Sequence, residues 1–431
     1  IVCIRVIYFI FMIINSMIRP CVFNNKKIFL MKNIIFILLF STTIFAQGSA
    51  LSLYEESQKA LSSGNLDLAG EKIREAINLD KGNDKFRKEF DRLNGLRNKM
   101  INANRSVQDG RFDDAIAGFA DVIVNVSNSV EAYYGTAKAY EGKKDFTSAV
   151  KYYKQSLALD PNYKKAKTSI SNVAKKLYNS ANQDYKNGNL ESALSKYEQV
   201  LGINSRLYQA YFQMGVLQKK MGNLSLAIQN YQSALSIKKT FDKGWYSLGL
   251  AYRDNGDMDN AKSSFEETIR LNKKYYKAHK SLGDIFIESE KYEDAIASFK
   301  SAIAIKSKYA PAYHSMGITY AKMEDYTRSA DSLTKAVDLQ PKEFLSWFHL
   351  SEAHNKLNDC EAAKTAALEA IDLKKNFGGG WFELGIAEYC GGKGNKNTSI
   401  NHFEKARNDR EWRKMAEYEI DRVRNPEKYE E

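Results

Sequence analysis

Proline and glycine are scarce in this sequence of 431 residues, with 5 prolines and 25 glycines. Proline breaks helix interiors, and a share of about one residue in a hundred, against a usual share of about 5%, predicts a mostly helical chain. Together with 44% apolar and 27% charged residues, this composition excludes a disordered or a collagen-like protein. The sequence therefore predicts an all-α fold with a large buried core.

Acidic residues are absent from residues 1–46, which hold five Lys or Arg and two apolar runs. Met31 and Lys32 begin a short positive region, and residues 34–46 form an apolar stretch of about the length of a secretory h-region. We interpret residues 31–50 as a signal peptide, cleaved after Ala46 or after Ala50, and predict export to a periplasmic or secreted location. Without residues 1–46, and so without five basic residues, the formal net charge falls from +12 to +7.

Residues 1–30 precede a plausible start methionine and begin with a residue that is not Met. We interpret them as upstream sequence translated in error. The alternative is an N-terminal membrane anchor over residues 1–18, although this stretch contains Arg5 and Asn15 and is at the short limit for a bilayer core.

A unit of 34 residues repeats from about residue 50 onward. It carries a small residue at the eighth place, Gly near the fifteenth, Ala at the twentieth and an aromatic residue at the twenty-fourth. The clearest copy spans residues 242–275 and contains Trp245, Leu248, Gly249, Tyr252, Gly256, Ala261, Phe265 and Ile269. Further copies start near Ala50, Leu96, Val130, Ala174, Tyr208, Tyr276, Ala310, Phe344 and Gly378.

This unit resembles the tetratricopeptide repeat (TPR), a pair of antiparallel helices. The resemblance implies a right-handed α-solenoid of about ten helix pairs with a concave inner face. We divide the chain into N-terminal repeats (51–129), a core array (130–409), and a C-terminal segment (410–431) in which Trp412, Met415, Ala416 and Ile420 predict a capping helix. Extra residues before Leu96 and Ala174 predict lengthened helices. Ser57 and Ser351 at the eighth place predict slightly looser helix contact, and residues 391–398 predict a loosened turn.

In this family the inner face is lined by the second, fifth, ninth, twelfth and thirteenth places of each first helix. Carried over place by place, this implies a peptide-binding surface in which aromatic rings make apolar contacts and basic side chains meet carboxylates. The alternative is that the rings pack between neighbouring repeats and the lysines only keep the face solvated. The candidate binding residues are Tyr178, Asn182, Phe212, Lys219, Tyr246, Arg253, Lys280, His314, Phe348 and Phe382.

Patterns for catalysis and for cofactors are missing, including His-Glu-x-x-His, Gly-x-Ser-x-Gly and the phosphate-binding Gly-x-x-x-x-Gly-Lys. We therefore predict no enzyme activity, no cofactor and no small-molecule substrate. His279, His314 and His349 are 35 residues apart whereas the repeat is 34, so each is expected to point elsewhere and no metal site is predicted. Acidic residues such as Asp254 and Asp284 interrupt the basic face, which argues against nucleic-acid binding.

Two cysteines, Cys360 and Cys390, remain in the predicted mature chain. The repeat places Cys360 at the start of the second helix of the ninth unit and Cys390 at the end of the first helix of the tenth, and these helix ends lie side by side in an antiparallel stack. In an oxidising compartment we expect a disulfide that closes about 30 residues; the alternative is two unpaired thiols.

These observations favour a non-catalytic scaffold that binds peptide segments of envelope or secreted proteins on its concave face. The alternative is a structural subunit of a cell-envelope assembly, secretion or cell-wall complex, which would dock through its ends and its convex face.

Overall fold

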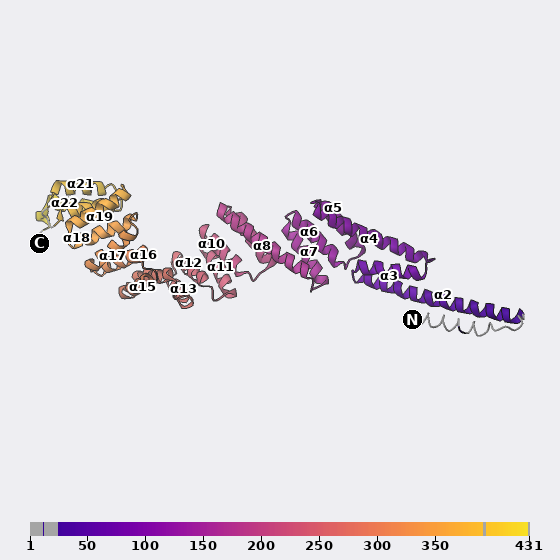
Figure 1. Ribbon diagram of the computed structural model, residues 1–431. Helices are drawn as coiled ribbons and strands as arrows, with labels where there is room; N and C mark the ends of the chain where they lie inside the picture. Colours follow the sequence, from indigo (N-terminus) through magenta and orange to yellow (C-terminus); the bar gives the residue numbers. More distant parts are fainter. Residues whose placement is uncertain (1–11, 13–24, 391–393, 430–431) are drawn as a thin grey trace. The chain divides into compact units, whose positions relative to one another are not determined.

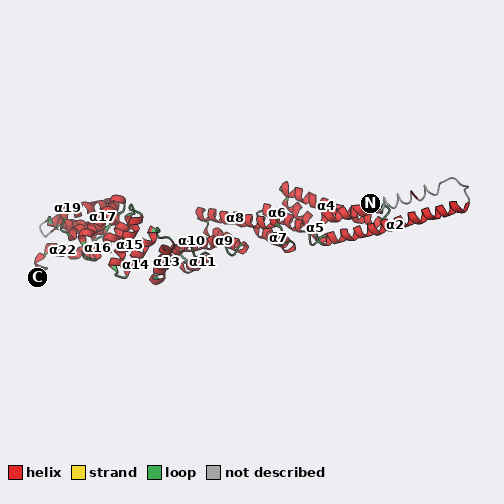
Figure 2. Ribbon diagram, turned by 60° about the horizontal axis from the view of Figure 1, so that its bottom comes forward, coloured by secondary structure: helices red, strands yellow, loops and turns green. Residues whose placement is uncertain are grey.

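A computed structural model of the chain describes residue 12, residues 25–390 and residues 394–429. Within this part of the chain the regular elements are all helices (Figure 2), as the sequence predicts. The chain divides into two compact units, Ile1–Lys176 and Leu177–Glu431. Most of the expected upstream segment and of the alternative anchor over residues 1–18 lies outside the described residues, as do residues 391–393 of the expected loosened turn.

The first unit consists of consecutive antiparallel helices (Figure 1). They are α2 (Asn25–Ser62), α3 (Leu66–Leu79), α4 (Asp84–Gln108), α5 (Phe112–Asn125), α6 (Val130–Gly142), α7 (Phe146–Leu159) and the beginning of α8 (Lys164–Asn187). The extra residues before Leu96 and Ala174 lengthen α4 to 25 residues and α8 to 24, which confirms the prediction of longer helices there.

The second unit starts within α8 and continues the pairing, with first helices of 13 residues and second helices of 14 residues from α10 to α19. Its further helices are α9 (Leu190–Ile203), α10 (Tyr208–Lys220), α11 (Leu224–Ile237), α12 (Asp242–Asp254), α13 (Met258–Leu271), α14 (Tyr276–Glu288), α15 (Tyr292–Ile305), α16 (Ala310–Lys322), α17 (Tyr326–Leu339), α18 (Phe344–Lys356), α19 (Cys360–Leu373), α20 (Gly378–Glu388), α21 (Lys396–Ala406), α22 (Arg413–Arg424) and the 3₁₀ turn Pro426–Lys428. The described helices from α2 to α21 thus form ten pairs.

Small residues at the eighth place let the two helices of a pair approach closely. A Cβ added at Gly249 would lie 2.6 Å from the ring of Phe265, and one added at Gly283 would lie 2.5 Å from the ring of Phe299. Both rings are completely buried, so the missing side chain makes room for the largest core residue of the pair.

The serines at the eighth place do not loosen the contact between helices, contrary to the sequence-based expectation. Ser57 Oγ donates a hydrogen bond of 2.8 Å to the carbonyl oxygen of Ala69, and Ser351 Oγ donates one of 2.8 Å to that of Ala363. Both hydroxyls are buried, and each links the first helix of its pair to the second. A small polar residue therefore serves as a cross-link at this close contact.

In the first nine pairs the turn between the two helices has a left-handed residue at the fifteenth place. Gly222 and Gly256 take φ values of 84° and 81°, which glycine adopts without steric cost. Four repeats carry a side chain at the same place with φ between 55° and 63°, which costs conformational energy: Lys144, Glu290, Glu324 and Asn358.

The C-terminal helix α22 covers the apolar face of the last pair, as predicted. Ala416, Ile420 and Val423 are buried against Phe382 and Phe403. Met415, which the sequence pattern also assigned to the buried face, is 49% exposed.

The N-terminal helix α2 has an exposed apolar first part and a second part that packs into the first repeat. Its segment Phe29–Ser62 is long and apolar enough to cross a membrane, judged by length and composition alone, and the side chains of Phe36 and Phe45 are exposed. Ala50, further along the same helix, is only 1% exposed and belongs to the buried cluster of the first repeat, to which α3 contributes Ala69, Ile73 and Ala76. The first repeat therefore begins to pack at Ala50.

Candidate functional site: one helix face and a separate pocket

The ten predicted binding residues all lie on first helices of the second unit. We call this surface the first-helix face; it comprises the fifth, ninth, twelfth and thirteenth places of α8, α10, α12, α14, α16, α18 and α20. Eight of the ten side chains are half-buried on this face, and two are buried.

The aromatic residues at the fifth place pack against aromatic rings of the same pair and of the segment before the next first helix. The ring of Phe212 lies 5.6 Å from that of Tyr231 on the second helix of its own pair and 5.0 Å from that of Phe241, which precedes the next first helix. The same arrangement recurs for Tyr246 with Phe265 (5.6 Å) and Tyr275 (4.9 Å), and for Tyr178 with Tyr197 (5.7 Å). These rings hold neighbouring repeats together and leave only part of their surface accessible.

Phe348 and Phe382 are not available to a partner, contrary to the prediction. Each is only 7% exposed because Trp412, which precedes α22, packs over both rings at centroid distances of 5.6 Å and 5.0 Å. At these two positions the rings are covered by the C-terminal segment, an arrangement that neither the binding prediction nor the alternative of packing between repeats included.

The predicted cations Lys219 and Arg253 meet at one carboxylate. Lys219 Nζ lies 2.7 Å from Asp254 Oδ2, and the Arg253 guanidinium lies 3.1 Å from Asp254 Oδ1. Burial alone would raise the pKa of Asp254, but hydrogen bonds from Lys219 and Arg253 outweigh it and hold that pKa below its ordinary value. Two positive charges thus share one negative charge.

Lys280 and Asn182 are also engaged within the protein. Lys280 Nζ lies 2.7 Å from Asp284 Oδ2, and the Ser315 hydroxyl donates to Asp284 Oδ1 at 3.2 Å. The Tyr197 hydroxyl donates to Asn182 Oδ1 at 2.6 Å. The acidic and polar neighbours that interrupt the basic face in the sequence therefore neutralise or bind much of it in the structure.

His314 of this face lies close to His349 of the next first helix, which the sequence analysis did not expect. The rings of His314 and His349 lie 5.5 Å apart, and His314 Nδ1 is 2.8 Å from the Ser346 hydroxyl. Burial, followed by the nearby His349 and Lys280, lowers the pKa of His314 to about 4, so its ring is neutral at pH 7. Across the described residues no group of three or more His, Cys, Asp or Glu side chains is arranged to hold a metal ion.

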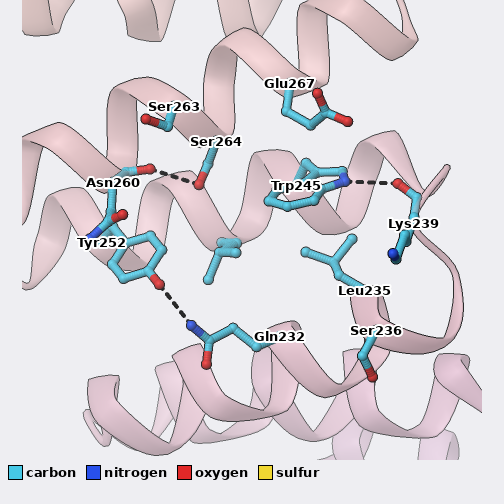
Figure 3. Close-up of a pocket in the computed structure, with 11 residues that line it drawn as sticks. Gln232, Leu235, Ser236, Lys239, Trp245, Tyr252, Asn260, Ser263, Ser264 and Glu267 are labelled. Carbon is cyan, nitrogen blue, oxygen red and sulfur yellow. Dashed lines mark hydrogen bonds between the residues drawn. The ribbon is translucent and has the colours of Figure 1, made fainter.

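Sequence reasoning missed a pocket on a different face of α12. It has a volume of about 650 Å³ and lies between α11 and α13, with Trp245 and Tyr252 of α12 between these two walls (Figure 3). Leu248 of α12 also lines it. Its walls carry Gln232, Leu235, Ser236 and Lys239 on one side and Asn260, Ser263, Ser264 and Glu267 on the other.

This pocket is separate from the first-helix face. Successive residues of an α-helix are rotated by about 100°, so Trp245 and Tyr252 project about 100° away from Tyr246 and Arg253. The Tyr252 hydroxyl accepts a hydrogen bond of 2.8 Å from Gln232 Nε2 at one end of the pocket. The available sequence signal was a tryptophan at the fourth place combined with a small Ser264 on the following second helix.

Cys360 and Cys390 lie at neighbouring helix ends. Cys360 is the first residue of α19, and Cys390 follows the last residue of α20 by two positions. Their Cα atoms are 5.9 Å apart, within the usual range for a disulfide, and their sulfur atoms are joined in the structure.

Comparison with known protein families identifies several of the repeats. Family models described as "TPR repeat" and "Tetratricopeptide repeat" match residues 130–163, 208–241, 242–275, 283–324 and 310–343. No curated protein matches the sequence.

Several solved structures are similar to this chain at low sequence identity. A tetratricopeptide repeat protein from Parabacteroides merdae has a TM-score of 0.44 and 15% identity, covering 58% of this chain and 99% of its own. The C-terminal part of a TPR repeat-containing protein from Cytophaga hutchinsonii has a TM-score of 0.47 and 14% identity, covering 56% and 97%. YrrB, described as a TPR protein with an unusual peptide-binding site, has a TM-score of 0.36 and 24% identity, covering 39% and 88%.

Proposed function

Since the chain is a tetratricopeptide-repeat protein, we propose that it is a non-catalytic scaffold whose first-helix face binds peptide segments of partner proteins. Helix-repeat arrays of this kind present extended binding surfaces, and the family supports protein–protein interaction in general. Beyond protein–protein interaction in general, we propose which face binds, what chemistry the bound segment has, and that the scaffold is exported.

The observation that carries the proposal is the shared carboxylate of Asp254. Lys219 and Arg253 both contact it, so this cluster retains an excess positive charge. The half-buried rings of Phe212 and Tyr246 lie on the same face, on the same two helices. A peptide segment that carries an acidic side chain next to an apolar one matches this combination.

The test reverses the charge of the cluster of Lys219, Arg253 and Asp254 and leaves the packed aromatic rings unchanged. Alanine at Phe212 or Tyr246 would leave a cavity and cost about 3–5 kcal/mol, which would confuse loss of binding with unfolding. We therefore choose Lys219→Glu with Arg253→Glu in tagged full-length protein, purified from its own cell envelope with whatever partners it binds.

The matched control carries the same charge change on exposed positions of second helices, as Lys300→Glu with Lys335→Glu in α15 and α17. Partners that disappear only with the Lys219/Arg253 variant support peptide recognition on the first-helix face. Partners retained by both variants would reject it and favour the alternative, a structural subunit of an envelope complex held by other surfaces.

We further propose that the scaffold is exported and that, where α2 is cleaved, the cut follows Ala46. Cleavage after Ala50 would remove a residue that is 1% exposed from the core of the first repeat, whereas cleavage after Ala46 leaves it in place. Intact-mass measurement of the purified protein tests this. A chain that begins at Leu51 contradicts the cleavage proposal, and a chain that retains residues 31–46 shows that α2 is not cleaved, as a membrane anchor requires.

A further inference from the structure

One copy of the repeat shows how an aromatic ring fills the gap beside a first helix. In residues 130–163 the fourth and eleventh places are Tyr133 and Tyr140 of α6, and the twenty-third place is Tyr152 of α7. The Tyr152 ring is stacked on that of Tyr140 at 5.3 Å between centroids and on that of Tyr133 at 6.4 Å, with interplanar angles of 11° and 29°. Residues seven apart lie about 10.5 Å from each other along a helix, so the Tyr152 ring lies between the other two.

The copy at residues 242–275 has the two outer rings but not the inserted one. Its fourth, eleventh and twenty-third places are Trp245, Tyr252 and Ser264. Both rings and Ser264 line the pocket of about 650 Å³ between α11 and α13 (Figure 3). A serine at the twenty-third place therefore leaves open the space that a third ring fills in the other copy.

The walls of the pocket suit an uncharged, apolar occupant. Leu235 and Leu248 line it beside the two rings. Glu267 also lines it, but the Arg270 guanidinium already binds both oxygens of this carboxylate at 2.6 Å. The carboxylate is thus not free to select a cation.

Lys239 lines the same pocket and is compatible with an aromatic occupant. Its carbonyl oxygen accepts a hydrogen bond of 2.9 Å from the indole Nε1 of Trp245, which fixes the orientation of that ring. In the copy with the inserted ring, Lys151 Nζ lies 5.9 Å from the centroid of Tyr152. A lysine beside an inserted ring therefore has a precedent in this chain, and the contact is attractive.

Three other copies carry rings at the fourth and eleventh places and a small residue at the twenty-third, but a charged side chain contacts the eleventh-place ring in each. Lys262 Nζ lies 5.5 Å from the centroid of Phe286. The Arg328 guanidinium lies 4.6 Å from the centroid of Tyr320. In these two copies the protein itself supplies the group that meets the eleventh-place ring.

The third of these copies contains Trp347, and its eleventh place is an imidazole. This is His354, whose Nδ1 lies 3.3 Å from the Asp359 carboxylate. Tyr252, in contrast, is contacted at its hydroxyl by the neutral amide of Gln232 at 2.8 Å. Among the described copies, residues 242–275 thus combine two rings, a small twenty-third residue and an eleventh-place ring whose polar contact is uncharged.

We propose that the pocket between α11 and α13 binds an aromatic side chain of a partner polypeptide, inserted between the indole of Trp245 and the ring of Tyr252. The chain itself provides the precedent, because Tyr152 makes this contact within its own copy. Stacked rings at such distances attract each other beyond the burial of their apolar area. This site lies on a different face of α12 from the first-helix face, so it is independent of the peptide binding proposed above.

The test is fluorine NMR on full-length protein labelled with 5-fluorotryptophan. The chain has four tryptophans, and a Trp→Phe substitution of each assigns its signal. The probe is the peptide acetyl-Gly-Ala-Phe-Ala-Gly-amide, and the matched probe carries leucine in place of phenylalanine, which keeps the apolar character and removes the ring. We expect the phenylalanine peptide to shift the Trp245 signal in a saturable way, with half-saturation at an about two- to tenfold lower concentration than the leucine peptide. The Trp347 and Trp381 signals should stay in place.

Two variants and a control separate the contributions. Ser264→Tyr places a ring where Tyr152 stands in its copy and should abolish the response to the phenylalanine peptide. Tyr252→Leu keeps an apolar side chain but removes one of the two rings, so it should remove the preference for phenylalanine over leucine. Tyr313→Leu removes a fourth-place ring from α16 and should leave the response unchanged. Unchanged signals from the other three tryptophans show that each variant is folded.

Three outcomes overturn the proposal. The first is a Trp245 signal that ignores the phenylalanine peptide or responds to both peptides at the same concentration. The second is a folded Ser264→Tyr variant that still responds. The third is an equal response of Trp347, because it would show that an eleventh-place tyrosine is not required.

Discussion

Glu383 provides a sharp test of the packing of the last repeats, because this carboxyl group is buried in the protein interior. It is 7% exposed, and Asn355 Nδ2 donates to its Oε2 at 2.7 Å and to its backbone carbonyl oxygen at 2.9 Å. Burial raises the pKa of Glu383 to about 7. Glu352 and Lys356 of α18 and Glu419 of α22 are the charged groups that act on it, and the two carboxylates add to the increase.

The size and the direction of the effect on the free energy of unfolding follow from this pKa. A rise from the ordinary 4.5 to about 7 corresponds to about 3 kcal/mol of lost stability once the group is ionised in the folded protein. Because the pKa in the folded protein is the higher one, the folded state binds more protons between these values. The stabilisation is therefore complete below pH 4.5 and disappears as the pH rises through 7.

The perturbation is Glu383→Gln, which keeps the shape and cannot ionise. We expect this variant to exceed the wild type in stability by up to about 3 kcal/mol at pH 8 and by far less at pH 5. Long repeat arrays do not unfold as one unit, so the measurement is hydrogen exchange of the α20 amides, with variant and wild type compared at the same pH.

Glu361→Gln on the exposed surface of α19 is the matched control, and it should change the protection of α20 at neither pH. An equal difference between Glu383→Gln and wild type at pH 5 and pH 8 would refute the reasoning, because it would show that Glu383 does not titrate between those values in the folded protein.

Three further predictions concern the frame of the repeats. Glu290→Gly should stabilise the seventh pair by about 1 kcal/mol, because residue 290 has a φ of 56°, which glycine adopts without steric cost. Glu293→Gly inside α15 should instead destabilise the same pair. Hydrogen exchange of the amides of α14 and α15 at increasing denaturant concentration measures both effects. Ser351→Ala should cost about 1 kcal/mol by removing the bond to the Ala363 carbonyl, and unchanged protection of α18 and α19 would contradict this. Peptide mapping of the purified protein without reductant should find Cys360 linked to Cys390, a bond across 30 residues worth about 3 kcal/mol, and two free thiols there would exclude it.

The fold follows from the sequence because most repeats carry the same steric requirement. A small residue at the eighth place faces a large ring at the twenty-fourth, as with Gly249 and Phe265, and an aliphatic side chain such as Leu333 replaces the ring in some copies. One copy alone would be weak evidence, but ten copies in the same register determine the helix pairs and their boundaries. The sequence also places Cys360 and Cys390 at adjacent helix ends for the same reason.

The state of individual surface residues does not follow from the repeat, because it depends on neighbours that the repeat does not specify. Phe348 and Phe382 occupy the same place as Phe212, yet Trp412 covers them, and Trp412 belongs to the segment beyond the last pair. From its place in the repeat, Lys219 is predicted to be available to a partner, whereas in the structure it already contacts Asp254 of the next repeat.

The same dependence on neighbours explains why one tryptophan is covered and another borders a pocket. Trp245 and Trp381 have the same place, the same hydrogen bond from the indole to the carbonyl oxygen six residues earlier and the same glycine four residues later, so the first helix alone does not distinguish them. The difference lies in the second helix, where Ser264 and Glu267 replace His402 and Lys405, which pack on the indole of Trp381. Identical residues on first helices therefore meet different surroundings in different copies, because the second helix that faces them carries different side chains.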